Sequence, residues 1–67
     1  MIQIRLNGEP HSLSEQTSLA DLLRQLQVNP QKVAVAKNLE VVLRSELPHT
    51  RMEEGDEIEI FQAVGGG

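Results

Sequence analysis

The sequence predicts an α+β fold in which a mixed sheet of four to five strands packs on one helix. Both ends of the chain alternate apolar and polar residues, which is the period of a half-buried strand. A single leucine stripe with helical spacing lies between them. The 67 residues contain no cysteine, so side-chain packing alone must stabilise this small domain.

The first strand is predicted at Ile2–Leu6, where apolar and polar side chains alternate. Asn7–Gly8 follows directly and is a strong signal for a two-residue hairpin turn. The return strand is weaker, because Pro10 favours a sheet edge or a strand start. His11 and Leu13 share one face of that strand.

The helix is predicted to begin after Ser18, which forms a capping box with Asp21 three residues later. The acidic side chain also suits the positive end of the helix dipole. The helix must end before Pro30, which gives it about ten residues. Its apolar stripe consists of Leu19, Leu22, Leu23 and Leu26.

Two strands are predicted after the helix. Lys32–Ala36 has apolar residues on both faces and suits a central position under the helix. Asn38–Glu40 turns the chain, since asparagine tolerates a left-handed conformation. Val41–Leu43 then forms a short strand.

The last third of the chain is predicted to be a loop followed by a strand. Arg44–Glu54 is expected to be loop-like and is interrupted by Pro48. Gly55–Asp56 forms a turn, and Glu57–Val64 forms the final strand.

The resulting order, β-β-α-β-β-β, favours a ubiquitin-like β-grasp fold, in which the first and last strands lie side by side and parallel in the middle of the sheet. A ferredoxin-like alternative needs a second helix, and the proline in segment 44–54 opposes one. We therefore assign residues 1–64 to a β-grasp domain and residues 65–67 to a flexible glycine tail.

The composition favours a protein partner over nucleic acid. The net charge is −4, which serves solubility or docking on a basic partner. The six basic residues are scattered and Phe61 is the only aromatic residue, so nucleic-acid binding is disfavoured. The chain shows neither a signal peptide nor an apolar run that could span a membrane, and we expect a cytoplasmic protein that is monomeric when free. Half of the acidic residues lie close together, at Glu53, Glu54, Asp56, Glu57 and Glu59.

Side-chain catalysis is poorly supported by the sequence. His11 and His49 lie in unrelated segments and, without cysteine, do not form a metal site. The serines have no base at a supporting position, and Ser18 already caps the helix. The acidic cluster lacks the spacing of a calcium loop, and no helix follows a glycine-rich turn to bind phosphate. We expect neither a catalytic residue nor a bound cofactor or metal.

The glycine tail is the candidate reactive segment. Val64 is followed by Gly65, Gly66 and Gly67, and this run comes directly after a predicted strand. Glycines leave a slender backbone that can enter a narrow channel, and the α-carboxylate of Gly67 can attack the α-phosphate of ATP. A sulfur donor could then displace AMP and leave a thiocarboxylate. The alternative is a frayed or truncated terminus.

Taken together, the chain resembles the ThiS family of sulfur carriers of thiamine biosynthesis. The resemblance covers essentially all 67 residues. The family commonly has a glycine turn where this chain has Leu39-Glu40, and a proline at the position of Leu43. The segments that carry the resemblance are Ile4–Gly8, Ser18–Leu23, Val33–Asn38, Val41–Glu46, Gly55–Ile60 and Val64–Gly67.

The resemblance implies a non-enzymatic carrier with three protein partners. A ubiquitin-activating-like adenylyltransferase would use ATP to adenylate Gly67, and Gly65 and Gly66 would thread into its site. A cysteine-derived persulfide would supply the sulfur, and thiazole synthase would receive it. Three alternatives remain open: the small subunit of molybdopterin synthase, a carrier for another sulfur acceptor, and a ubiquitin-like modifier that forms isopeptide bonds.

The last strand also predicts a docking surface. Ile58 and Ile60 of the last strand are expected to pack against the leucine stripe of the helix, so the opposite face of the strand is expected to face solvent. Phe61 then lies exposed near the tail, and Val64 is expected to be exposed beyond the helix. We expect both residues, with Glu57 and Glu59, to bind a partner, unless a β-bulge turns Phe61 inward. The face towards the helix carries Ile58, Ile60 and Gln62, and the opposite face carries Glu57, Glu59 and Phe61.

Overall fold

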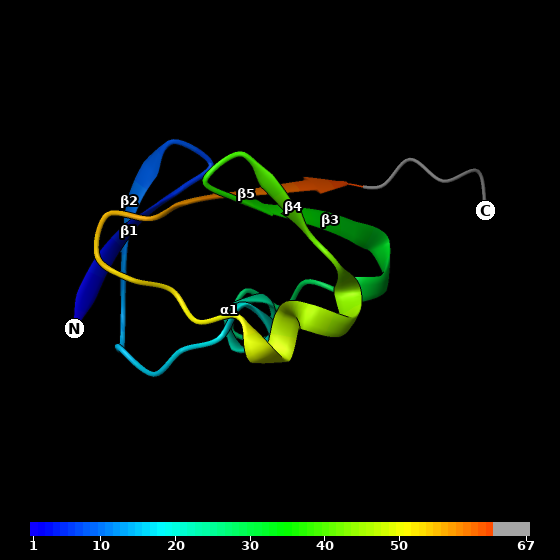
Figure 1. Ribbon diagram of the computed structural model, residues 1–67, viewed down its shortest axis with the longest axis horizontal. Helices are drawn as coiled ribbons and strands as arrows, with labels where there is room; N and C mark the ends of the chain where they lie inside the picture. The colour runs from blue at the N-terminus through cyan, green and yellow to red at the C-terminus, as the bar shows by residue number, and fades with distance from the viewer. Residues whose placement is uncertain (63–67) are drawn as a thin grey trace.

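A computed structural model describes residues 1–62, and residues 63–67 lie outside the described part. The five strands form one sheet in the order β2-β1-β5-β3-β4 (Figure 1). The helix α1 covers one face of this sheet. The elements are β1 (Ile2–Leu6), β2 (Glu9–Leu13), α1 (Leu19–Gln25), η1 (Pro30–Lys32), β3 (Val33–Lys37), β4 (Glu40–Val42), η2 (Arg44–His49) and β5 (Glu57–Gln62).

The strand order confirms the predicted β-grasp fold. β1 and β5 pair in parallel in the middle of the sheet, through Arg5 with Glu57 and Leu6 with Ile58. The other three pairings are antiparallel. The parallel pair needs a long crossover, and the chain between β1 and β5 supplies it with α1 and the second hairpin.

Left-handed residues close both hairpins. Asn7 (φ 51°) and Gly8 (φ 86°) join β1 to β2, as the sequence predicts for this dipeptide. Asn38 (φ 51°) and Leu39 (φ 72°) join β3 to β4 in the same way. Leu39 is 86% exposed. In the left-handed conformation its Cβ crowds the following carbonyl oxygen, so this position is better suited to glycine.

Helix α1 begins with the predicted capping box and is shorter than predicted. The Asp21 N–H donates to Ser18 Oγ (3.1 Å), and the Ser18 N–H donates to Asp21 Oδ2 (3.4 Å). Its seven residues end at Gln25 because Gln27 adopts φ 59°. The Val28 N–H then donates to the Leu23 carbonyl (2.9 Å), which satisfies a helix-end carbonyl in a Schellman motif.

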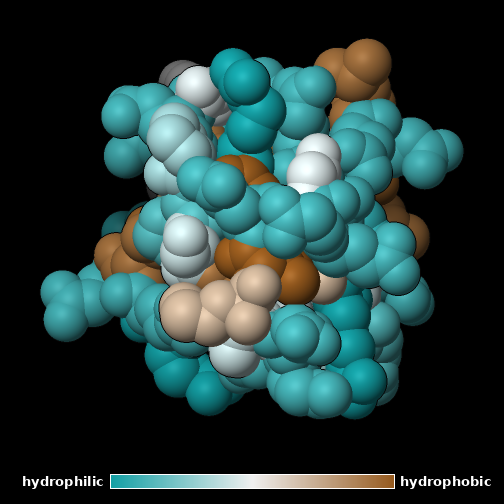
Figure 2. All heavy atoms as spheres, turned by 90° about the vertical axis from the view of Figure 1, so that its left-hand side faces the viewer, coloured by the Kyte–Doolittle hydropathy of each residue, from teal (hydrophilic) through white to brown (hydrophobic). Residues whose placement is uncertain are grey.

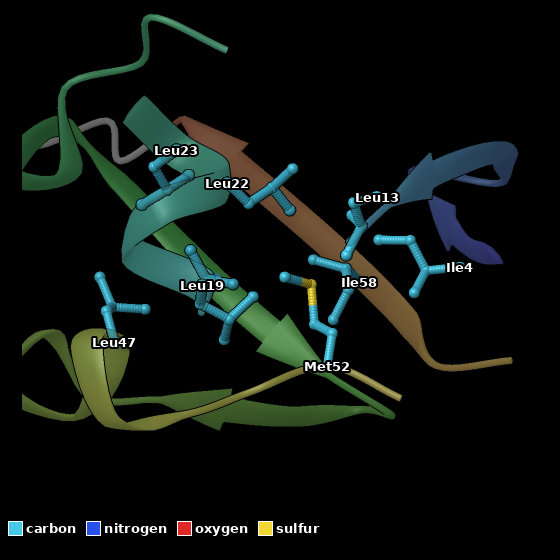
Figure 3. Packing of buried hydrophobic residues seen from close by; sticks show 9 residues of the cluster. Ile4, Leu13, Leu19, Leu22, Leu23, Leu47, Met52 and Ile58 are labelled. Carbon is cyan, nitrogen blue, oxygen red and sulfur yellow. The ribbon is translucent and has the colours of Figure 1, made fainter. Parts of the chain in front are cut away.

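The core lies between α1 and the sheet (Figure 3). One part of it corrects the sequence analysis, which treated Arg44–Glu54 as a loop. Arg44–His49 is a 3-10 helix that includes Pro48, and it brings Leu47 into the core. Met52 is buried a few residues later. The buried cluster consists of Ile4, Leu13, Leu19, Leu22, Leu23, Val35, Leu47, Met52 and Ile58.

Three polar side chains hold β5 in place, and we call them the β5 clasp: Asn7, Asn38 and Asp56. Asn7 Oδ1 accepts from the Ile60 N–H (2.9 Å), and Asn38 Oδ1 accepts from the Glu57 N–H (2.9 Å). The two hairpin turns therefore bind β5 from opposite sides, because β1 and β3 flank it.

Asp56 completes the clasp at the start of β5. Its Oδ2 accepts from the Glu53 N–H (2.8 Å), and its Oδ1 accepts from Asn38 Nδ2 (3.2 Å). Lys37 Nζ lies 3.6 Å from Oδ2 and pairs with the Asp56 carboxylate, whose side chain is only 12% exposed. The carboxylate thus links the β3–β4 turn to the loop that enters β5.

None of the helices in residues 1–62 has the length and apolar character needed to cross a membrane.

Asp56→Ala is expected to lower the free energy of unfolding by about 1–3 kcal/mol, because it leaves the Glu53 N–H, Asn38 Nδ2 and Lys37 without their shared acceptor. Urea denaturation measures this change. Glu53→Ala is the control, since it removes the same charge from an exposed side chain of the same loop. Equal stability losses in the two variants would contradict the role of Asp56.

Candidate functional site

The candidate site is the end of β5, the strand that leads into the glycines. β5 is described as far as Gln62, so Gly65, Gly66, Gly67 and Val64 lie outside the described residues. The other predicted site residues, Glu57, Glu59 and Phe61, all belong to β5. The structure therefore shows the part of the site that precedes the tail.

Phe61 is exposed on the outer face of the sheet, the face opposite α1. Its side chain is 49% exposed, whereas Ile58 on the inner face is fully buried. The pairing of β5 with β3 runs without a break from Lys37–Ile58 to Val33–Gln62, so no bulge turns Phe61 inward. The exposure expected from the sequence is thus observed, and the binding role of Phe61 stays a prediction.

An apolar surface extends from Phe61 across the neighbouring strands. Phe61 pairs with the exposed Ala34 of β3. Two residues further along β3 on the same face, Ala36 pairs with Val41 of β4. Val41 is 71% exposed. We call Ala34, Val41 and Phe61 the outer patch. Leu43 directly follows β4 and is also exposed (68%).

Carboxylates flank the outer patch. Glu59 is half-buried and pairs with Ala36 of β3, which in turn pairs with Val41 of β4. Glu57 is exposed and pairs with Arg5 of β1. The outer face is therefore charged where β5 begins and apolar where it approaches residue 62. A partner with an apolar contact surface and basic residues beside it would complement this arrangement.

The end of the molecule away from residue 62 has a different character. Figure 2 views the side that lies at the left of Figure 1, where the N-terminus is, and hydrophilic atoms dominate it. The exposed carboxylates Glu53 and Glu54 belong to the loop that precedes β5. This end suits solvent, which leaves the outer patch as the better candidate for an apolar contact.

The described residues offer little for side-chain catalysis. His11 is half-buried opposite Ile4, and His49 is exposed at the end of η2. Ser18 Oγ is engaged in the helix cap, and Ser14 Oγ bonds Thr17 Oγ1 (2.8 Å). Within residues 1–62 no three His, Asp or Glu side chains are grouped as metal ligands.

The sequence analysis missed two features of the site. It placed Lys32–Ala36 under the helix on one side without assigning the residues that face outward, and the structure shows Ala34 exposed beside Phe61. It also took Asn7 and Asn38 only as turn residues, although their side chains bind β5. The asparagines themselves were a usable signal, because an Asn side chain at a turn often bonds nearby backbone.

A family model and a sequence relative match the chain over most of its length. The ThiS family model matches residues 4–67. A protein of Thermus thermophilus named "Sulfur carrier protein ThiS" is 37% identical over 62 residues, which cover 92% of this chain and 95% of that protein.

Longer relatives and a solved structure add to this. A "Thiazole synthase" of Magnetococcus marinus is 42% identical over 66 residues, and one of Paramagnetospirillum magneticum is 36% identical over 66 residues. This chain spans about a fifth of the length of each. The crystal structure of a thiamine biosynthesis protein (ThiS) from Geobacter metallireducens superposes with a TM-score of 0.86 at 30% identity, covering 98% of this chain and 100% of that chain.

Phe61→Ala is expected to lower the free energy of unfolding by at most about 1 kcal/mol, because the side chain is half-exposed. Ile58→Ala, three residues earlier on the inner face, is the contrast and should cost about 2–5 kcal/mol. Urea denaturation of both variants checks the difference. A Phe61→Ala loss as large as that of Ile58→Ala would place Phe61 in the core and remove it from the docking surface.

Proposed function

Because the chain belongs to the ThiS family, we propose that it is a sulfur carrier of thiamine biosynthesis whose C-terminal carboxylate, on Gly67, carries the sulfur. The family match carries this proposal, since it extends through the glycines to residue 67. The sulfur-carrier relative in Thermus thermophilus is matched over 95% of its length, which supports a carrier rather than an enzyme.

The proposed chemistry takes place on the tail and is supplied by partners. The Gly67 carboxylate attacks the α-phosphorus of ATP, pyrophosphate leaves, and an acyl-adenylate forms. The outer sulfur of a cysteine-derived persulfide attacks the acyl carbon, and AMP leaves. A thiol then reduces the resulting acyl disulfide to the thiocarboxylate. ATP is bound by the adenylyltransferase, so the carrier itself needs no bound cofactor.

Glycines suit this chemistry for two reasons. They place no side chain beside the reacting carbonyl, and they allow the backbone to enter a narrow site. Three extended residues span about 10 Å, so Gly65 and Gly66 allow Gly67 to reach a site while the domain stays outside. The distance from the docked domain to the reacting atom is thereby fixed.

The outer patch is the proposed docking surface for the ubiquitin-activating-like adenylyltransferase. Phe61 is its aromatic anchor, and it precedes the tail by a few residues. Glu57 and Glu59 would pair with basic residues at the rim of the interface and so orient the domain. Val64 follows on the same chain and is proposed to contact the entrance of the enzyme's site.

Thiazole synthase is the proposed sulfur acceptor. The proteins named thiazole synthase in Magnetococcus marinus and Paramagnetospirillum magneticum each contain a segment similar to nearly all of this chain, within a much longer protein. A carrier-like segment joined to a synthase raises the local concentration of one for the other. Such an arrangement supports a functional pairing between this chain and a separate thiazole synthase.

Incubation of the chain with ATP, the adenylyltransferase and a persulfide source is expected to exchange one oxygen for sulfur at Gly67. Intact-protein mass spectrometry detects the mass difference between the two atoms. Removal of Gly67, or addition of one alanine after it, should abolish the exchange because the reacting carbonyl no longer sits at the required distance. Both variants should keep the unfolding midpoint of the wild type. Efficient sulfur loading of the extended chain without trimming would contradict the proposal.

A further inference from the structure

β1 ends before β5 does, and this leaves part of one edge of β5 uncovered. The parallel pairing of the two strands comprises only Arg5–Glu57 and Leu6–Ile58. Its backbone bonds include one from the Arg5 N–H to the Asp56 carbonyl (2.9 Å) and one from the Asn7 N–H to the Ile58 carbonyl (2.9 Å). Beyond Asn7 the chain turns away into β2.

The Asn7 side chain extends the pairing by one step, to the Ile60 N–H (2.9 Å). The N–H and C=O of one strand residue point to the same side, and alternate residues point to opposite sides. The backbone N–H and C=O groups therefore point towards β1 at Asp56, Ile58 and Ile60. The backbone groups of Gln62 point to the same side by the same alternation. The Ile60 carbonyl and the Gln62 N–H and carbonyl point to the side that β1 has left, where no loop or side chain of residues 1–62 bonds them.

The other side of β5 is already occupied. β3 pairs with β5 as far as Val33–Gln62, so the last described residues have one bonded edge and one exposed edge. Proteins normally cover or interrupt such an edge, since it can accept a foreign strand. Within residues 1–62, no group hydrogen-bonds this edge beyond the Asn7 side chain.

We infer that this edge of β5, at Ile60 and Gln62, pairs with one extended segment of the adenylyltransferase, which adds to the sheet as a further strand. The inference rests on the proposed function and deepens it. The edge is continuous with the chain that must enter the adenylating site, so a strand bound here would run beside the tail's entry path.

Strand addition at this place would fix the position of the tail. Backbone pairing sets the register residue by residue, and a shift by one residue would reverse every side chain. The segment's side chain beside Phe61 would lie on the outer face and is expected to be apolar, in continuity with the outer patch. Binding of the adenylyltransferase would then combine the Phe61 side chain as an anchor with backbone hydrogen bonds that set the register.

Gln62→Pro tests the inference, because proline removes the N–H that faces the exposed edge and leaves the bonds from Phe61 to β3 in place. Gln62→Ala is the matched control, since it removes the same side chain but keeps the N–H. Affinity for the adenylyltransferase from the same genome is measured by titration calorimetry. We expect Gln62→Pro to weaken binding by about tenfold or more, and Gln62→Ala to stay near the wild type.

Hydrogen exchange gives a second measurement that requires no variant. The Gln62 amide of the wild-type chain should become protected in the complex, and an unprotected amide would overturn the inference. Binding of Gln62→Pro that equals Gln62→Ala would overturn it as well. A wild-type chain that neither binds the enzyme nor acquires sulfur would instead overturn the proposed function, and the inference with it.

Discussion

Three polar side chains accept hydrogen bonds from the backbone around β5 and help to fix where this strand lies, and the rest of the molecule depends on that strand. Asn7 and Asn38 bond its backbone from the two flanking hairpins, and Asp56 ties its start to the β3–β4 turn. β5 also contributes Ile58 to the core and Phe61 to the outer patch. Because one strand joins core, surface and tail, a fixed β5 gives the tail a fixed origin.

The proposed function separates recognition from chemistry. The described residues supply position: an apolar outer patch, flanking carboxylates, and a strand edge that stays exposed near residue 62. The proposed reaction needs only a carboxylate on a slender backbone, and in this proposal the partner proteins supply ATP, sulfur and general acid–base groups. Such a carrier can be small, since its core must stabilise one docking face and no enclosed active site.

Local signals in the sequence predicted the elements that depend on local physics. The alternation in Ile2–Leu6 and the capping box of Ser18 depend on neighbouring residues, and both were confirmed. The 3-10 helix around Leu47 was missed, because its stability comes from burial against α1 rather than from propensity. Which residues of Lys32–Ala36 face outward was left open, since this depends on strand order and register. Gly67 was singled out by chemistry alone and lies outside the described residues.

The most direct test of this separation is a competition measurement. The chain lacking Gly67 keeps the clasp, the outer patch and the β5 edge but loses the reacting group. Added to a sulfur-loading reaction of the wild-type chain, it is expected to inhibit competitively, with an inhibition constant close to the Michaelis constant of the wild type, because the domain carries the binding energy. Absence of inhibition at concentrations far above that constant would show that the terminal glycine itself carries recognition, and would contradict the separation.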